Sequence, residues 1–185
     1  MIVIGILAPE HDVSIIKLLK KRFYANKKTC MVIKAENVET DYIYQLGSMG
    51  IDFMIIDIYG YVPNNVFLDL LIYDNTADKI LCDINIKKNI TANTKLIYNG
   101  DVGKVHISGD FDMISYGLSH KADITLSSIC TCEDGAEIIY CIQRNITALS
   151  GKMTEISERV IKYDEENINV YHILACAAAE IICMG

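Results

Sequence analysis

The chain has 185 residues, of which 51% are hydrophobic and 22% charged, so it can bury a sizeable core. Its formal net charge of −7 argues against a nucleic-acid or anionic-membrane partner. No apolar run is long enough to span a bilayer, and the first apolar strand begins at residue 2 with no basic leader before it.

Apolar runs and helical patterns alternate through the first half of the chain. Strands are expected at 2–7, 29–34, 52–58, 68–73, 95–98 and 113–116. Helices are expected at 13–24 and 38–47, with one short helix between 78 and 94. Near-continuous apolar strands separated by helices are typical of a parallel sheet that is covered on both faces.

The pattern changes after Tyr116. Runs at 124–132 and 136–143 flank a Glu-Asp-Gly turn, which favours a β-hairpin. A further pair of short strands is expected at 146–149 and 158–163, and an alanine-rich helix from 168 to 184.

The predicted fold class is therefore α/β. A mostly parallel sheet with helices on both faces carries a small antiparallel appendage and ends in a C-terminal Ala-rich helix. We expect one domain, 1–185, made of a parallel part (1–117), the hairpin appendage (118–167) and the closing helix (168–185).

The seven cysteines are odd in number, and several fall inside apolar segments. This pattern favours reduced, buried thiols over a disulfide framework, so we expect a cytoplasmic protein.

The turn after the first strand lies where nucleotide-binding proteins hold phosphates, with backbone N–H groups, a helix dipole and one lysine. Here the strand contains Gly5, and the turn reads Ala-Pro-Glu-His-Asp over 8–12. It has no lysine, and its two carboxylates would repel a triphosphate. The alternative is that Glu10 and Asp12 cap the next helix, whose N-terminus carboxylates stabilise.

Six short motifs follow one another at 4–14, 52–57, 70–79, 96–101, 116–117 and 167–185. In this order they resemble the central, ATP-binding domain of the Mur ligase family. These enzymes activate a carboxylate with ATP as an acyl phosphate, which an amine then attacks. The resemblance covers almost the whole chain and implies a P-loop type of sheet. It leaves no room for the family's N-terminal and C-terminal domains.

At the phosphate loop, the resemblance places Asp12 where the family has its lysine and Val13 where it has a magnesium-binding Thr or Ser. Ser14 can replace Val13 if the register slips by one residue. A full negative charge about 4 Å from the γ-phosphate costs roughly 4 kcal/mol even at an effective dielectric constant of about 20. This repulsion is enough to abolish tight nucleotide binding.

Asp57 stands where the family has a glutamate that holds magnesium. With Asp74 or Asp78 it could hold a hydrated cation. The alternative is a solvated loop carboxylate. Lys79 replaces a metal-binding histidine, which puts a second metal in doubt.

Asn99 and Asp101 resemble a motif at a strand end that faces adenine in the family. An asparagine can pair with an adenine edge, because it offers one donor and one acceptor. The alternative is a structural turn, since Asn-Gly-Asp is also favourable turn chemistry. His172, on the last helix, is expected to be a core or interface histidine.

The resemblance implies a degenerate domain with no catalytic residues and no cofactor, acting as a binding or assembly protein. In the family, some surfaces of this domain contact the flanking domains. Here another protein would have to cover these surfaces, so we expect self-association or a protein partner. The alternative is a weak ATP- and Mg-binding protein, or a remnant of an ATP-dependent carboxylate–amine ligase of cell-wall or folate type. Its nucleotide candidates are Gly5, Ser14, Asn99 and Asp101, and its metal candidates are Asp57 and Asp78.

Overall fold

The computed structural model describes residues 1–9, 13–59, 61–74, 86–102, 105, 107, 109, 111–132, 135–163 and 169–185. Its strands are β1 (Ile2–Leu7), β2 (Cys30–Lys34), β3 (Phe53–Asp57), β4 (Leu70–Tyr73), β5 (Lys95–Asn99), β6 (Asp112–Gly117), β7 (Ile124–Cys132), β8 (Gly135–Ile142), β9 (Ile146–Thr147), β10 (Met153–Thr154) and β11 (Ser157–Tyr163). Its α-helices are α1 (Ser14–Ala25), α2 (Thr40–Ser48) and α4 (Val170–Met184), and its 3₁₀ helices are η1 (Ala35–Asn37) and η3 (Ile86–Asn89). None of the described helices has the length and hydrophobicity needed to cross a membrane.

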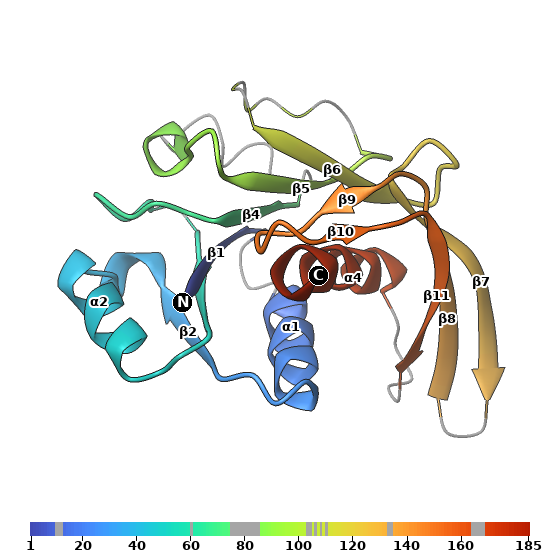
Figure 1. Cartoon of the computed structure of the whole chain (residues 1–185), viewed down its shortest axis with the longest axis horizontal. Helices are drawn as coiled ribbons and strands as arrows, with labels where there is room; N and C mark the ends of the chain where they lie inside the picture. The colour runs from blue at the N-terminus through green and yellow to red at the C-terminus, as the bar shows by residue number, and fades with distance from the viewer. Residues whose placement is uncertain are drawn as a thin grey trace.

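Nine strands form one sheet in the order β11-β8-β7-β6-β5-β4-β1-β3-β2, and β9 and β10 form a separate pair. All neighbours from β2 to β7 in this order are parallel, whereas β8 pairs antiparallel with both β7 and β11. The predicted α/β class is therefore confirmed. The antiparallel strands continue the main sheet, because β7 pairs with the end of β6. They bend away from the parallel part at the right of Figure 1.

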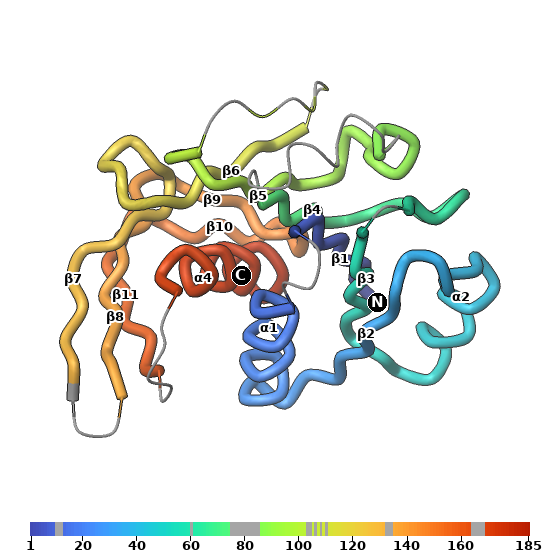
Figure 2. Tube along the Cα trace, turned by 180° about the vertical axis from the view of Figure 1, so that it is seen from behind, coloured from blue at the N-terminus to red at the C-terminus, as the bar shows by residue number. Residues whose placement is uncertain are grey.

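Helices cover both faces of the sheet, as the sequence predicted. Successive side chains of β1 alternate between two apolar clusters. Ile4 and Ile6 pack in the cluster that contains α1 and α4. Val3 and Leu7 pack in the other, with residues of η1, α2 and η3. Figure 2 shows α1 and α4 side by side, with α2 and the β7–β8–β11 strands at opposite ends of the molecule.

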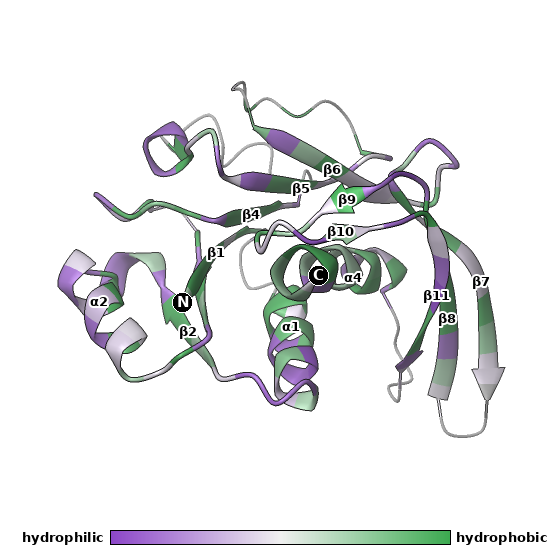
Figure 3. Ribbon diagram, in the orientation of Figure 1, coloured by the Kyte–Doolittle hydropathy of each residue, from purple (hydrophilic) through white to green (hydrophobic). Residues whose placement is uncertain are grey.

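The closing helix α4 is almost wholly buried, because it packs against both α1 and the sheet. Ala177, Ala178 and Ala179 have no exposed surface, and such small side chains let neighbouring elements approach closely. Glu180 accepts two hydrogen bonds of 2.8 Å from the Arg22 guanidinium, which ties α4 to α1. Figure 3 shows a difference in hydropathy: α4 is hydrophobic along most of its length, whereas α1 mixes hydrophobic and polar residues.

One predicted strand pairing is wrong. Residues 146–149 were expected to pair with 158–163, but β9 pairs with β10, whereas β11 pairs with β8. Gly151 adopts a positive φ of 84° between β9 and β10, so the chain turns back at once. β11 instead joins the sheet edge, where Ile161 is buried in the core beside Ile138 of β8.

Two predicted helices also differ from the structure. The helix expected at 38–47 begins at Thr40, because Val38 is buried in an extended conformation after the η1 turn. Of the short helix expected between 78 and 94, residues 78–85 lie outside the described part of the chain, and the 3₁₀ helix η3 occupies 86–89.

Candidate functional site

The carboxyl ends of β1, β3 and β4 meet at one edge of the sheet. β1 lies between β3 and β4, so the chain passes to opposite sides of β1 at this point. Open α/β sheets bind ligands outside the carboxyl ends of their strands at such a switch point. The backbone N–H of Ile58 donates to the carbonyl oxygen of Ile6, and that of Asp74 to the carbonyl oxygen of Leu7, each over 2.9 Å. These two hydrogen bonds hold the ends of β1, β3 and β4 together.

The helix that follows β1 begins at Ser14. Val13 precedes it and has no polar side chain with which to cap the helix. Glu10, His11 and Asp12 lie outside the described residues. The capping of α1 by Glu10 and Asp12 therefore stays a prediction, as does the repulsion of phosphate by these two carboxylates.

Gly5 lies inside β1, opposite Ile56 and Leu71, and not at the end of the strand. A Cβ atom at this position would lie 2.7 Å from Leu68 Cδ1 and 2.8 Å from Ile58 Cδ1. Close packing over the middle of the strand therefore accounts for this glycine without a ligand.

Asn99 and Asp101 form a turn at the end of β5. Asn99 is 5% exposed, and its Oδ1 accepts the N–H of Asp101 over 3.0 Å. The Asp101 carboxylate accepts the N–H of Leu118 and, over 3.1 Å, that of Ser119. Gly117 lies beneath this carboxylate, and a Cβ there would be 2.7 Å from Asp101 Oδ2. Both side chains thus bind the chain's own backbone, in the manner of a structural turn.

Asp101 also connects the sheet to the start of α4. The pKa of Tyr171 lies above its usual value, first because of burial and then because of the charge of Asp101 and a hydrogen bond to it. One carboxylate therefore links β5, the loop after β6 and α4.

Asp57 ends β3 and is partly buried. Burial raises its pKa, and the charge of Lys34 opposes the shift. Asp78 and Lys79 lie outside the described residues, so no second metal ligand from that segment is placed. Across the described part of the chain, no group of three or more His, Cys, Asp or Glu side chains could hold a metal ion.

Asp57→Asn is expected to raise the thermal midpoint at pH 7 by about 2 °C. Since burial raises the pKa of Asp57 above the usual 3.8, stability falls as the pH rises from about 4 through the raised pKa. Asparagine removes this loss, so its advantage should vanish below about pH 3. Scanning fluorimetry from pH 3 to pH 8 measures the difference.

Asp52→Asn is the matched control with the opposite sign. Hydrogen bonds from the backbone N–H and hydroxyl of Thr29, each 2.8 Å, and then the charge of Lys28 lower the pKa of Asp52. Its stabilising effect is present above the usual carboxyl pKa and disappears as the pH falls through the lowered value. We expect a lower midpoint at pH 7 for this variant. A fall for Asp57→Asn parallel to that of the control would contradict the prediction.

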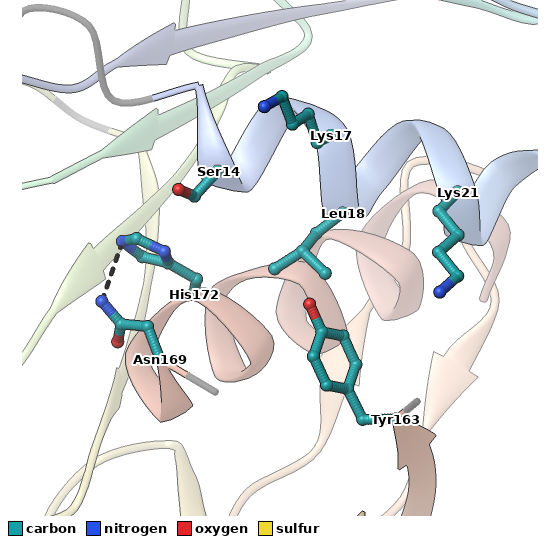
Figure 4. Close-up of a pocket in the computed structure, with 7 residues that line it drawn as sticks. All are labelled: Ser14, Lys17, Leu18, Lys21, Tyr163, Asn169 and His172. Carbon is teal, nitrogen blue, oxygen red and sulfur yellow. Dashed lines mark hydrogen bonds between the residues drawn. The ribbon is translucent and has the colours of Figure 1, made fainter. Parts of the chain in front are cut away.

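A pocket of about 350 Å³ lies between α1 and the start of α4. Figure 4 shows the residues that line it: Ser14, Lys17, Leu18, Lys21, Tyr163, Asn169 and His172. His172 is 8% exposed, and its Nε2 lies 3.2 Å from Asn169 Nδ2. The Lys21 ammonium lies 5.8 Å from the centre of the Tyr163 ring. Such a mixture of cations and polar groups can hold a small polar or anionic group.

Of the nucleotide and metal candidates, Ser14 alone is among the residues described as lining this pocket. The sequence analysis missed the pocket, because its walls come from α1 and from Tyr163, Asn169 and His172, which are far apart in the sequence. The four-residue spacing of Lys17 and Lys21 was the available local signal, since it places two cations on one side of a helix.

Solved structures of ligases share this arrangement of strands and helices. A MurF ligase from Thermotoga maritima in complex with ADP matches with a TM-score of 0.61 at 14% identity, over 97% of this chain and 44% of that chain. This chain has a Mur ligase-like fold. A UDP-N-acetylmuramoyl-L-alanyl-D-glutamate–2,6-diaminopimelate ligase matches with a TM-score of 0.63 at 11% identity, over 100% of this chain and 43% of that chain. MurF from Acinetobacter baumannii matches with a TM-score of 0.58 at 9% identity, over 100% of this chain and 43% of that chain.

The Mur ligase-like chain spans less than half the length of these ligases. At such low identity, the likeness concerns the fold. No family model and no curated protein matches the sequence.

Proposed function

We propose that this Mur ligase-like chain is non-catalytic and acts by binding another macromolecule instead of using ATP. The observation that carries the proposal is the bonding of Asn99 and Asp101. Their acceptor oxygens hold the N–H groups of Asp101, Leu118 and Ser119. A nucleotide that used these oxygens would have to displace hydrogen bonds within the fold, at about 0.5–1.5 kcal/mol each or more where a charge is involved.

The sequence after β1 supports the same proposal. A phosphate loop needs a cation beside the terminal phosphate, but Asp12 occupies that place in the resemblance and Val13 replaces a magnesium-binding hydroxyl. The described residues also fit magnesium poorly. Lys34 places a positive charge near the Asp57 carboxylate, and that charge opposes the binding of a divalent cation there.

A titration with ATP and Mg²⁺ tests the proposal. A ligand that binds the folded state stabilises it by about 2.7 kcal/mol at 100 times its Kd. We expect no change in thermal midpoint for the wild type at millimolar ATP and Mg²⁺, and no ATP hydrolysis. Asp12→Lys combined with Val13→Thr is the gain-of-binding control. A rising midpoint, ATP hydrolysis or amide formation by the wild-type protein would show that the proposal is wrong.

The second candidate function is weak binding of ATP and Mg²⁺, by a remnant of an ATP-dependent carboxylate–amine ligase. The ADP complex of the structurally similar Thermotoga maritima ligase favours it. Its contacts would come from Ser14, Asn99 and Asp101, with Gly5 in the preceding strand and Asp57 and Asp78 near the metal. Saturable stabilisation by ATP that requires Mg²⁺ and is lost in Ser14→Ala would favour this candidate.

A further inference from the structure

Charge is separated along the first third of the chain. Residues 13–34 contain seven Lys or Arg and no Asp or Glu, which leaves ten basic against 24 acidic residues elsewhere. The next segment, 35–59, contains five acidic residues and no Lys or Arg. The first segment forms α1 and β2, and the second forms η1, α2 and β3. The strongly acidic protein therefore carries one strongly basic helix.

The three lysines of α1 are exposed, as is Lys27 just after the helix, whereas Arg22 pairs with Glu180 of α4. Five exposed residues form what we call the basic face: Lys17, Lys20, Lys21, Tyr24 and Lys27. Tyr24 is 51% exposed, and the Lys20 ammonium lies 5.8 Å from the centre of its ring. The apolar side of α1, with Ile15, Leu19 and Phe23, is buried in the core. Because its apolar side is already covered, α1 has no continuous apolar face to insert into a membrane.

An exposed surface of the opposite charge lies on η1, on α2 and on the residues that cap α2. Its members form what we call the acidic face: Glu36, Glu39, Asp41, Tyr44 and Met49. Tyr44 and Met49 are each 75% exposed, which is high for large apolar side chains. Tyr and Met are enriched in protein–protein interfaces, and charged residues such as these carboxylates belong to the polar rim around them.

The two faces lie on opposite sides of the sheet. Phe23 of α1 packs in one apolar cluster, and Leu46 of α2 packs in the other, on the far side of β2 and β3. Figures 1 and 2 show α1 and α2 separated by these strands. One molecule therefore cannot bring its own two faces together. A symmetric pair that joined two basic faces would place lysines against lysines, which costs free energy.

We propose that the basic face of α1 docks a second copy of this chain through that copy's acidic face. The contact joins unlike surfaces, so it repeats head to tail and produces short rings or filaments. The inference names a partner for the binding role proposed above and rests on it. Nucleotide binding and self-association are separate measurements, so the failure of one can be told from the failure of the other.

Sedimentation velocity of the full chain at low and high salt tests the inference. At an ionic strength of about 0.02 M, the weight-average mass should rise with protein concentration. At about 1 M the Debye length is only about 3 Å, and the protein should be monomeric. Lys17→Glu with Lys20→Glu alters the basic face, and Glu36→Lys with Glu39→Lys alters the acidic face. Each pair should weaken association at least about tenfold.

Two further samples make the result specific. Lys121→Glu with Lys152→Glu changes two exposed lysines outside both faces and shifts the net charge as the basic-face pair does, so it should associate like the wild type. An equimolar mixture of the basic-face and acidic-face variants should associate again, because each supplies the charge that the other needs. A wild type that stays monomeric at low salt, or a mixture that does not associate, would overturn the inference. Retention of such a monomer on heparin through the same lysines would identify a polyanion as the occupant instead.

Discussion

Phe23→Ala is expected to lower the free energy of unfolding by about 3–5 kcal/mol. The Phe23 side chain has no exposed surface, and its ring stacks on Phe53 with the centroids 4.1 Å apart and an angle of 16° between the planes. Truncation leaves a cavity between α1 and the sheet and also removes the ring stacking, worth about 0.5–1.5 kcal/mol more. Urea unfolding followed by circular dichroism measures the loss.

Phe23→Leu is the matched control, because it keeps most of the apolar volume and removes the aromatic stacking. Its cost should be roughly 1 kcal/mol. In a cycle with Phe53→Leu, the second substitution should cost less once Phe23 is already leucine. A loss under about 1 kcal/mol for Phe23→Ala would mean that α1 does not depend on this pair of rings. The contact that orients the basic face of α1 toward solvent would then have to be another one.

The sequence predicted most of the fold because the local patterns and the tertiary packing agree. The buried strands near Ile4, Ile55 and Ile72 are apolar on both faces, as a covered parallel sheet requires. The pairing of β9 could not be predicted in this way, since a two-residue strand has no periodicity of its own. Its partner was decided by the turn at Gly151 and by the burial of Ile161 in β11.

The candidate site was harder to predict, since its side chains act on distant parts of the chain. The sequence located Asn99 and Asp101 at a strand end, and left adenine contact and a turn as alternatives. The amides that Asp101 binds belong to Leu118 and Ser119, 17 and 18 residues later, and no local pattern indicates that contact. The pocket beside His172 likewise exists only where α1 and α4 pack together.

Asp101→Ala is expected to lower the free energy of unfolding by about 2 kcal/mol. The substitution leaves the N–H groups of Leu118 and Ser119 without their acceptor, and Tyr171 loses a hydrogen bond. Asp101 is exposed, so water replaces part of what is lost, and the expected cost is well below that of three buried bonds. Asp101→Asn keeps one acceptor oxygen and should cost less. Urea unfolding measures all three proteins.

A double-mutant cycle with Gly117→Ala separates this structural role from a ligand-binding role. In the wild type, a Cβ at Gly117 would meet the Asp101 carboxylate at 2.7 Å, so Gly117→Ala should destabilise the protein by about 1–3 kcal/mol. In the Asp101→Ala background the carboxylate is gone, and the same substitution should cost less than about 0.5 kcal/mol. Costs that simply add would mean that Asp101 does not lie on Gly117 in solution. Its carboxylate would then be available to a ligand, and this turn could bind a nucleotide without losing hydrogen bonds of the fold.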